Sequence, residues 1–514
     1  MMQPANQIIA TIDGRGFSTR IARMLVCAVA LLVVDVCWKI GSAAEPGRLN
    51  VLFIAVDDLR PELGCYGHAR VKSPNIDRLA AAGTLFSRAY CQQAVCNPSR
   101  ASLMTGLRPD TLQVYDLPTH FRDKRPDAVT IAQHFKEHGY YTERIGKIFH
   151  TGHGNRDDKL SWTVMRNHPL APRFGKKGQD VLAMQKAELR KAGKNADGVR
   201  GLPWEAPDVA DSELTDGAIA DGAIKILREV KDKPFFLAVG FQNPHLPFVA
   251  PKKYWDLYSE KDVKLADNPQ PPKAAPSYAP HNSGELRSYY GIPPDGPLSQ
   301  GQSRKMVHGY WAAVSYMDAC VGRLLDELDR LRLRDQTLVI LWGDHGWFLG
   351  EHGMWCKHAN YEEAARAPLV ISVPGQKKRG TKSNALVEFV DIFPSLAEVC
   401  GLPQPKGLEG TSFKLLLDDP GRSWKRAAFH LYPRSIPGQG PGMGRAIRTE
   451  RFRLVKWTVP AKGFVEHELY DHANDPAENV NVAASPQYAD VLTELSARLH
   501  VGWRGELPRS PALK

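Results

Sequence analysis

The sequence predicts an α/β protein with a mainly parallel central sheet sandwiched by helices, followed by a smaller C-terminal part built on an antiparallel sheet. Three apolar runs that end in polar side chains indicate buried strands, at residues 49–58, 233–245 and 336–346. An amphipathic helix precedes the second and third runs, and alternating helices and strands are typical of a parallel sheet. With 514 residues, 43% of them hydrophobic and 24% charged, the chain is neither disordered nor fibrous.

The first 44 residues have the pattern of a signal peptide. Three arginines precede an apolar run at 24–34, and small residues end at Ala44, where a signal peptidase would cut. The run is too short to span a bilayer, and no later run is longer. We therefore expect an exported protein, periplasmic or secreted, without stable membrane insertion after cleavage.

The net charge favours acidic partners. It is +11 overall, and four basic and two acidic residues lie in 1–44, which leaves +9 for the mature chain. Basic residues are dense at 166–200, a segment that either attracts a polyanion or is a solvated helical face or loop. Aromatic residues do not alternate with these charges, so we do not expect a nucleic-acid partner.

Six cysteines remain after residue 44, and their spacing does not suggest a zinc site. One or two disulfides are possible in an oxidising compartment, but the sequence does not show which cysteines would pair. The six are Cys65, Cys91, Cys96, Cys320, Cys356 and Cys400.

The remaining elements follow from periodicity and composition. Apolar stripes predict helices over 219–230 and 310–328. Residues 268–299 are rich in proline and glycine and predict a long surface loop, either functional or a passive excursion. Short strand-like pieces at 427–433 and 446–458 and a closing helix to about residue 500 indicate the antiparallel part. We place the catalytic domain at 45–415 and the C-terminal subdomain at 416–514.

Polar side chains gather where the three predicted strands end. They are Asp57, Asp58, His245, Asp344 and His345. Because ligands bind beyond the carboxyl ends of parallel strands, these side chains predict a site at that edge. Carboxylates without a thiolate cage suit a hard divalent ion such as calcium or magnesium, although an Asp-Asp pair alone is also typical of a helix cap or turn.

Cys96 does not fit such a site as a cysteine. A soft thiolate is a poor ligand for a hard ion, and no neighbouring histidine would activate it as a nucleophile. The segment 96–106 reads CNPSRASLMTG and resembles the C-x-P-S-R-x-x-L-x-T-G signature of type I sulfatases, in which the cysteine is oxidised to formylglycine. Leu107 departs from the arginine of many members, and Arg108 follows it.

The resemblance covers residues 50–483 and is closest to the iduronate-2-sulfatase branch, in stretches such as GKIFHTG, PFFLAVGFQNPHLPF and GDHGWFLGEHGMWCK. It implies an alkaline-phosphatase-like fold and hydrolysis of a sulfate ester on a glycan, with 2-sulfated iduronate as the first expectation. It also implies one calcium ion and, as a partner, a formylglycine-generating or other sulfatase-maturating enzyme.

The resemblance assigns a role to each site residue. The implied calcium ligands are Asp57, Asp58, Cys96, Asp344 and His345. Arg100 and Lys147 would hold the modified side chain and the sulfate, and His150 would bond the formylglycine hydrate. His245 and Lys357 would contact the sulfate and the leaving group, with His245 as general acid and Trp347 lining the substrate site. Weaker pocket candidates are His308, Glu351, His352 and Arg448.

Three alternatives remain open. The first is a sulfatase for another sulfated polysaccharide or an aryl sulfate. The second is a phosphoesterase of the same superfamily, which normally calls for a serine or threonine nucleophile and a second metal site, so Cys96 argues against it. The third is a non-catalytic glycan-binding descendant, which we would expect to have lost Asp57, Asp344, Arg100 or Cys96, and all four are present.

Overall fold

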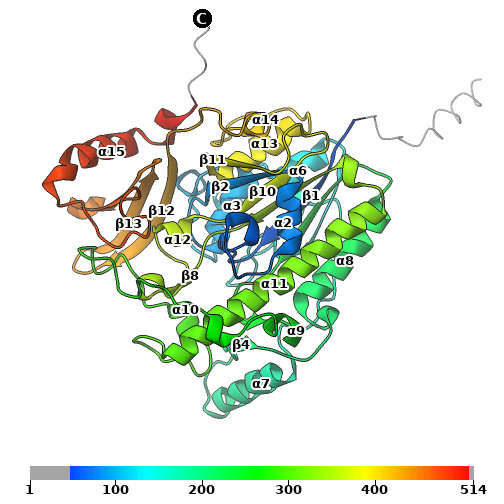
Figure 1. Cartoon of the computed structure of the whole chain (residues 1–514), viewed down its shortest axis with the longest axis horizontal. Coiled ribbons are helices and arrows are strands. Elements are labelled where there is room, and N and C mark those ends of the chain that lie inside the picture. The colour runs from blue at the N-terminus through cyan, green and yellow to red at the C-terminus, as the bar shows by residue number, and fades with distance from the viewer. Residues whose placement is uncertain (1–46, 509–514) are drawn as a thin grey trace, which may run out of the picture. The chain divides into compact units, whose positions relative to one another are not determined.

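Seven strands form the central sheet of the computed structural model, which describes residues 47–508 (Figure 1). Their order is β11-β2-β10-β7-β1-β5-β3, and within the described residues β10 is antiparallel to both neighbours while the other pairs are parallel. The predicted mainly parallel sheet is confirmed. The strands are β1 (Asn50–Val56), β2 (Thr84–Tyr90), β3 (Tyr141–Gly146), β5 (Phe235–Phe241), β7 (Thr337–Gly343), β10 (Leu369–Ser372) and β11 (Thr381–Glu388).

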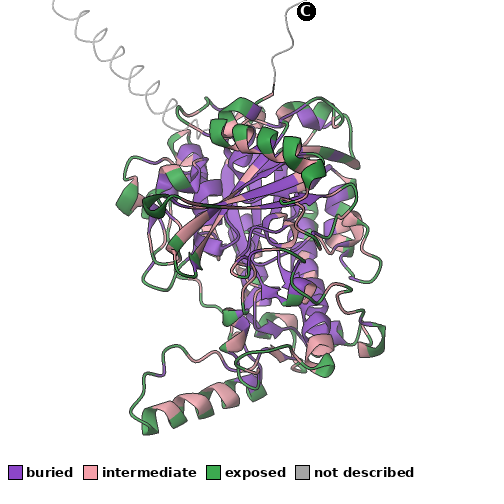
Figure 2. Cartoon of the chain, turned by 90° about the vertical axis from the view of Figure 1, so that its left-hand side faces the viewer, coloured by how far each residue is buried: buried purple, intermediate pink, exposed green. Residues whose placement is uncertain are grey.

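Helices cover both faces of this sheet, which explains why every residue of β1, β5 and β7 is buried. Leu52 and Ile54 of β1 pack into one apolar core, whereas Val51 and Phe53 pack into the other. The first core is covered by α2 (Pro74–Ala81), α8 (Thr215–Val230) and α11 (Gln300–Arg330). The second is covered by α3 (Cys96–Thr105), α6 (Ile131–Glu137) and α13 (Ile392–Val399). Figure 2 shows the buried sheet between exposed helical surfaces.

The two predicted long helices are α8 and α11, and both extend beyond their apolar stripes. The start of α11 is fixed by a capping box, in which the Ser299 hydroxyl accepts a hydrogen bond from the Gln302 backbone N–H at 3.2 Å. Tyr316 of α11 joins the two helices, because its hydroxyl accepts a hydrogen bond from the Gly217 N–H of α8 at 2.7 Å.

The predicted C-terminal antiparallel sheet is present as β12 (Ala428–Ile436), β13 (Gly440–Arg448), β14 (Phe452–Val459) and β15 (Phe464–Asp471), paired in that order. The closing helix is α15 (Ala489–Val501), whose Leu495 packs with Ile447 and Leu454 on one face of this sheet. The other face contributes Trp457 and Tyr470 to the second core of the central sheet. The boundary at 415 and 416 stays a prediction.

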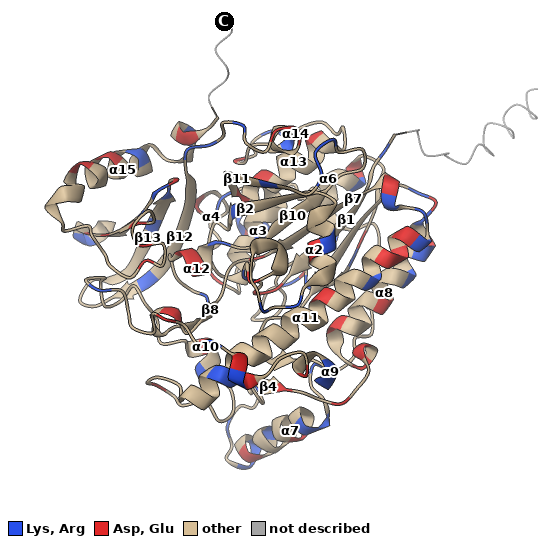
Figure 3. Cartoon of the chain, viewed as in Figure 1, with Lys and Arg blue, Asp and Glu red and all other residues tan. Residues whose placement is uncertain are grey.

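Shorter elements connect these layers. The helices are α4 (Pro109–Leu112), α5 (Phe121–Lys124), α7 (Lys176–Lys191), α9 (Lys252–Trp255), α10 (Gly284–Arg287), α12 (Glu362–Ala365) and α14 (Lys414–Asp418). Two small sheets pair β4 (Trp204–Glu205) with β6 (Phe248–Val249), and β8 (Phe348–Leu349) with β9 (Trp355–Cys356). The basic segment at 166–200 contains α7, which lies at the periphery with Gly178 as its one buried residue (Figures 1 and 3). This exposure fits the solvated helical face.

The structure bears on two further expectations. None of the helices between residues 47 and 508 is long and apolar enough to cross a membrane, and the predicted signal peptide lies outside the described residues. No disulfide joins the six cysteines of the described part, which are all free thiols.

A pair of glycines lets β3 and β5 approach closely beside the carboxyl edge of the sheet. Gly146 and Gly240 are register partners, and the Lys147 N–H donates to the Gly240 carbonyl at 2.9 Å. A Cβ added at Gly146 would lie 2.1 Å from the Gly240 oxygen, and one at Gly240 would lie 2.1 Å from the Lys147 oxygen. The two glycines therefore fix where Lys147 leaves the sheet.

We predict that Gly146→Ala is strongly destabilising. The residue has φ +74°, so a side chain costs about 1–2 kcal/mol in conformation, and the backbone clash adds about 1–3 kcal/mol. Gly401→Ala is the matched control, because Gly401 has φ +68° and nothing within 4 Å of its added Cβ. Urea unfolding should show a larger loss for Gly146→Ala, and equal losses would contradict this reading of the glycine pair.

Candidate active site

The carboxyl edge of the central sheet brings the predicted site residues together. Asp57 and Asp58 follow β1, Asp344 and His345 follow β7, and Lys147 follows β3. Contacts between side chains connect these residues with Cys96, the first residue of α3, and with Arg100, His245 and Lys357. The convergence of polar side chains at this edge is therefore present, and each predicted catalytic or metal residue except His150 joins one contact network.

Four side chains form a group that can hold a metal ion. One ligand atom each from Asp58, Cys96, Asp344 and His345 lies within 4.8 Å of the others. The His345 Nε2 is 3.3 Å from Asp58 Oδ1 and 3.5 Å from the Cys96 sulfur. A second group of Asp57, Asp58, Cys96 and His245 shares two of these residues, so the two groups describe one centre. Hard carboxylate oxygens dominate it, which suits calcium or magnesium.

Arg100 connects the ends of three strands through hydrogen bonds. Its Nε donates to Asp344 at 2.8 Å and its Nη2 donates to Asp57 at 3.0 Å, while Nη1 donates to the Ile148 carbonyl at 3.0 Å. The side chain is fully buried. Burial opposes its charge, but Asp344 and Asp57 outweigh that effect and raise the pKa of Arg100 above its ordinary value. The guanidinium is thus a permanent positive charge in the floor of the site.

Two lysines form ion pairs with further carboxylate oxygens of the site. Lys147 pairs with Asp57, whose pKa lies well below its ordinary value because Lys147 and Arg100 outweigh the effect of burial. Lys357 lies 2.9 Å from Asp58 Oδ2. Burial would lower the pKa of Lys357, but Asp58 and Glu285 raise it well above the ordinary value. Both ammonium groups therefore stay charged.

Three residues of the site have left-handed backbone, a conformation that costs about 1–3 kcal/mol each outside glycine. Asp58 has φ 60°, and Cys356 and His358, on either side of Lys357, have φ 77° and φ 70°. The surrounding structure thus constrains both partners of the Asp58–Lys357 ion pair.

Cys96 is 2% exposed, and its surroundings disfavour a thiolate. Burial, followed by the charge of Asp57, raises the pKa of the thiol well above its ordinary value. A neutral thiol is a weak nucleophile and a poor ligand for a hard ion. The chemical conflict expected from the sequence is therefore present in the structure.

The cluster is short of one positive charge when no metal is counted. Counted as ionised, its ion-paired groups are the carboxylates of Asp57, Asp58, Asp344 and Glu285 and the cations Arg100, Lys147 and Lys357. Four negative and three positive charges leave −1, and a divalent cation would change this to +1. The donor set therefore fits a divalent cation and, with it, an anionic substrate.

A cavity of about 370 Å³ opens onto this cluster beside Asp57. Its wall carries Lys147, His245 and Arg173. His150 also lines the cavity, with its ring stacked on His153 at a centroid distance of 5.3 Å. Burial and Lys147 lower the pKa of His150 to about 3, so its imidazole is neutral and can exchange hydrogen bonds with a bound group.

Two site residues were not predicted from the sequence. Glu285 of α10 lies 3.1 Å from His245 Nε2 and 3.0 Å from Lys357 Nζ. Arg173 lies in the basic segment, and its Nη2 is 3.3 Å from His245 Nδ1. In the sequence, the length of the 268–299 loop drew attention to the region that contains Glu285. The density of basic residues at 166–200 drew attention to the region that contains Arg173. Neither signal singles out the residue, because the contacts join distant parts of the chain.

Trp347 and the weaker pocket candidates lie away from the cavity beside Asp57. Trp347 is fully buried, and Lys357 lies over its ring at 5.0 Å from the centroid, so in this arrangement it supports Lys357 instead of facing the cavity. His308 contacts the Trp255 carbonyl at 2.9 Å, and Glu351 pairs with Arg60 at 2.9 Å. Within the described residues, none of these lines the cavity beside Asp57, and the same holds for His352 and Arg448.

Comparisons with known proteins agree with this geometry. The sulfatase family model matches residues 49–402, and a model of the C-terminal part of N-sulphoglucosamine sulphohydrolase matches residues 350–502. The chain is 34% identical to iduronate 2-sulfatase of Mus musculus over 550 residues, covering 91% of this chain and 97% of the relative. It is 30% identical to a sulfatase of Formosa agariphila, covering 88% and 87%.

Solved structures share the fold. One, in complex with D-glucosamine-2-N,6-O-disulfate, has a TM-score of 0.70 at 22% identity and covers 90% of this chain and 99% of its own. A phosphonate monoester hydrolase of Agrobacterium radiobacter has a TM-score of 0.72 at 25% identity and covers 90% and 100%. The expected alkaline-phosphatase-like fold and the similarity to iduronate-2-sulfatases are confirmed. By the family model over residues 49–402 and the identity of 34% to a curated relative, the chain belongs to the sulfatase family.

Proposed function

We propose that the protein hydrolyses a sulfate ester on a glycan, with 2-sulfated iduronate as its substrate, through residue 96 as formylglycine and with one calcium ion. The observation that carries the proposal is the position of Cys96. The thiol lies 3.5 Å from the His345 nitrogen and 4.0 Å from an Asp58 oxygen, inside a ring of carboxylates and fixed cations. A thiol has little chemistry to perform there, whereas an oxygen nucleophile in its place does.

The cations suit a sulfate monoester. Its sulfate group shares negative charge over three oxygens, and its hydrolysis is favoured by positive charge that is fixed before the substrate arrives. Arg100, Lys147 and Lys357 are held by buried ion pairs, so little reorganisation accompanies binding. In this proposal Arg100 and Lys147 hold residue 96 and the sulfate oxygens, and Lys357 contacts the sulfate.

Residues of this chain fit both groups that the proposal adds. Asp57, Asp58, Asp344 and His345 would hold calcium, which supplies Lewis-acid stabilisation of negative charge at the reacting oxygens. Formylglycine, once hydrated, supplies an oxygen nucleophile and a second oxygen through which sulfate can be expelled. Neutral His150 is available to hydrogen-bond that hydrate.

His245 is our candidate for the general acid that protonates the leaving alcohol. Its Nδ1 contacts the Leu246 carbonyl at 2.6 Å, and its Nε2 faces the cluster at 3.1 Å from Glu285 and 3.7 Å from Asp58. Glu285 therefore orients the nitrogen from which the proton would leave. The loop that carries His245 is itself held, because Asp216 accepts hydrogen bonds from the Gln242 and Asn243 N–H groups at 2.8 Å.

The choice of iduronate is supported by the similarity to the mouse iduronate 2-sulfatase and by the positive mature chain, which suits a carboxylated and sulfated glycan. We further propose that the protein is exported and that a sulfatase-maturating enzyme acts on it. A sulfatase for another polysaccharide remains an alternative. A phosphonate or phosphate monoesterase is a second candidate, because a phosphonate monoester hydrolase shares the fold with a TM-score of 0.72 and the same cations would bind phosphoryl oxygens.

A panel of substrates tests the proposal. Disaccharides that carry one sulfate each, an aryl sulfate and a phenyl phosphonate would be assayed with matured enzyme and calcium. We expect release of sulfate from the 2-sulfated iduronate disaccharide, and loss of turnover on chelation. Cys96→Ala should fold and lower the rate at least about a thousandfold, since the nucleophile is gone. Turnover of another sulfated sugar in place of iduronate would refute the specificity, and faster cleavage of the phosphonate would favour the second candidate.

A second prediction concerns Glu285, which we assign as a positioning residue. Glu285→Gln should lower kcat about ten- to a hundredfold with a smaller change in KM, because His245 and Lys357 lose a charged partner. Glu285 raises the pKa of Lys357, so its removal should move the alkaline limb of the kcat/KM profile to lower pH.

Glu398→Gln is the control, since Glu398 is a half-buried glutamate outside the site whose side chain lies 3.9 Å from Lys414. Glu285→Asp should recover part of the rate. An unchanged pH profile in Glu285→Gln, with an equal loss of rate, would mean that the residue serves only the stability of its loop.

A further inference from the structure

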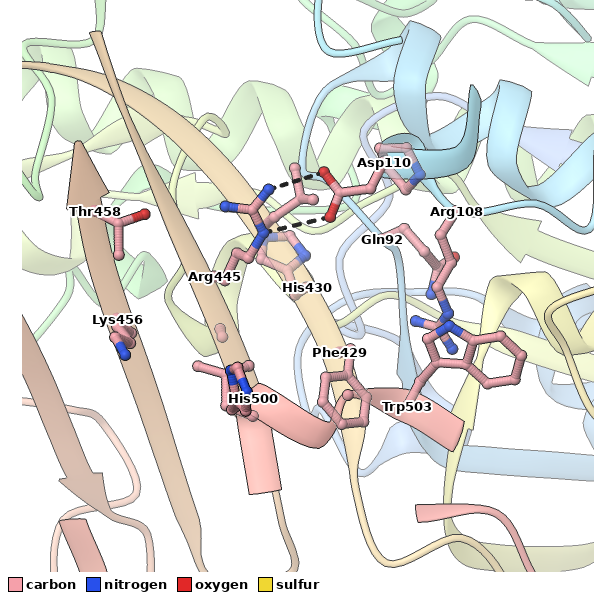
Figure 4. A pocket seen from close by; sticks show the side chains of 15 residues that line it. Gln92, Arg108, Asp110, Phe429, His430, Arg445, Lys456, Thr458, His500 and Trp503 are labelled. Carbon is pink, nitrogen blue, oxygen red and sulfur yellow. Dashed lines mark hydrogen bonds and ion pairs between the residues drawn. The ribbon is translucent and has the colours of Figure 1, made fainter. Parts of the chain in front are cut away.

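A second cavity, of about 380 Å³, lies between the α/β layers and the C-terminal sheet (Figure 4). We name it the C-terminal cleft and define it by Gln92, Arg108, Phe429, Arg445, Lys456 and Trp503. None of its lining residues lines the cavity at Asp57. Cys96 begins α3 and Arg108 follows its other end, and the ten-residue helix is about 15 Å long.

Two buried polar atoms at this cleft have no hydrogen-bond partner within the described residues. They are Oε1 of Gln92, a residue that is 1% exposed, and Nε of Arg108, which is 8% exposed. The other ends of both side chains are bound, since Arg108 makes two hydrogen bonds to Glu388 at 2.7 and 2.9 Å and Gln92 Nε2 reaches the same carboxylate. An unpartnered buried polar atom is unfavourable, so a ligand that offers one donor and one acceptor is favoured here.

The sheet side of the cleft carries excess positive charge. Arg445 of β13 and Lys456 of β14 are direct cross-strand partners, so both side chains leave the same face of the sheet. Figure 4 shows Arg445 reaching Asp110, with which it makes hydrogen bonds at 3.0 and 3.3 Å. Across the part of the chain that the structure describes, Lys456 has no acidic partner within ion-pair distance. The carboxylate of Asp110 thus faces the two cations Arg445 and Lys456. The excess positive charge favours an anion beside Lys456.

Two aromatic side chains, Trp503 and Phe429 of β12, form a part of the lining that we name the aromatic wall. The Arg108 guanidinium lies 5.1 Å from the Trp503 ring centroid and 5.8 Å from that of Phe429. Trp503 begins a 3-10 helix (Trp503–Glu506) that follows α15, so the end of the described chain closes the cleft. The lining of the cleft therefore combines aromatic rings, a buried and unpartnered amide oxygen, a buried and unpartnered guanidinium nitrogen, and an ammonium without an acidic partner among the described residues. A hydroxylated ring that carries an acidic group satisfies all four.

We propose that the C-terminal cleft is a second saccharide site, which binds one anionic sugar unit separately from the unit that is hydrolysed. The glycan is named here on the strength of the proposed function, whereas the site itself rests on the cleft. A sugar hydroxyl donates to Gln92 Oε1 and an oxygen of the ring substituents accepts from Arg108 Nε. The sulfate or carboxylate pairs with Lys456, and the apolar face of the ring packs on the aromatic wall.

Isothermal titration calorimetry on the full chain with Cys96→Ala tests this proposal, because that variant does not consume the ligand. The probe is a disaccharide that carries one sulfate and one carboxylate, titrated to millimolar concentration. We expect two binding events per chain. Adding Lys456→Glu should remove one of them by weakening it at least about tenfold. Adding Lys377→Glu makes the same charge change at an exposed lysine outside the cleft and should leave both events.

A variant without a charge change tests whether binding needs the cleft itself or only the general attraction of anions to positive charge. Thr458 also lines the cleft, and Thr458→Trp should fill it and remove the same event. The proposal is overturned if Lys456→Glu or Thr458→Trp leaves every binding event of the parent variant in place, or if the parent variant binds no disaccharide. If the catalytic cavity does not bind this glycan, the Cys96→Ala chain shows one binding event. Loss of that event when Lys456→Glu is added still supports the cleft. The failure of the cleft and the failure of the proposed function thus give different results.

Discussion

The buried ion pairs of Arg100 are the interaction on which the rest of the site depends. Its guanidinium joins Asp57 after β1 to Asp344 after β7, and its hydrogen bond to the Lys147 carbonyl adds the end of β3. Removing one partner of such a buried network costs about 3–5 kcal/mol, because a charge is left uncompensated. Arg100 also lies one helical turn after Cys96 on α3, so the same residue sets the nucleophile above the strand ends.

This arrangement explains why the site can hold so many charges without solvent. Each of the four carboxylates has a fixed cation: Arg100 and Lys147 at Asp57, Arg100 at Asp344, and Lys357 at both Asp58 and Glu285. The charges remain one cation short of neutrality, and a divalent ion reverses the sign and makes the cavity suitable for an anion. Strain at Asp58, Cys356 and His358 is consistent with a site whose geometry is set before substrate binds.

Much of the fold and of the central cluster was predictable, for a physical reason. Parallel strands buried on both faces have continuous apolar sequences, so β1, β5 and β7 were visible, and their carboxyl ends located Asp57, Asp58 and Asp344. Glu285 was not predictable, because it reaches His245 and Lys357 from a loop whose path depends on the whole fold. The surroundings of Trp347 could not be decided from the sequence for a related reason. Its indole packs beneath Lys357, and a sequence does not show which face of a residue is covered.

The central claim is that residue 96 does not work as a cysteine, and the mass of one peptide tests it most directly. Trypsin releases residues 89–100, which contain both Cys91 and Cys96, so fragmentation must locate the change. The account predicts that the peptide from a host with a maturating enzyme is lighter by about 18 Da at residue 96, with Cys91 unchanged. An intact thiol at residue 96 in an enzyme that hydrolyses sulfate esters would contradict it.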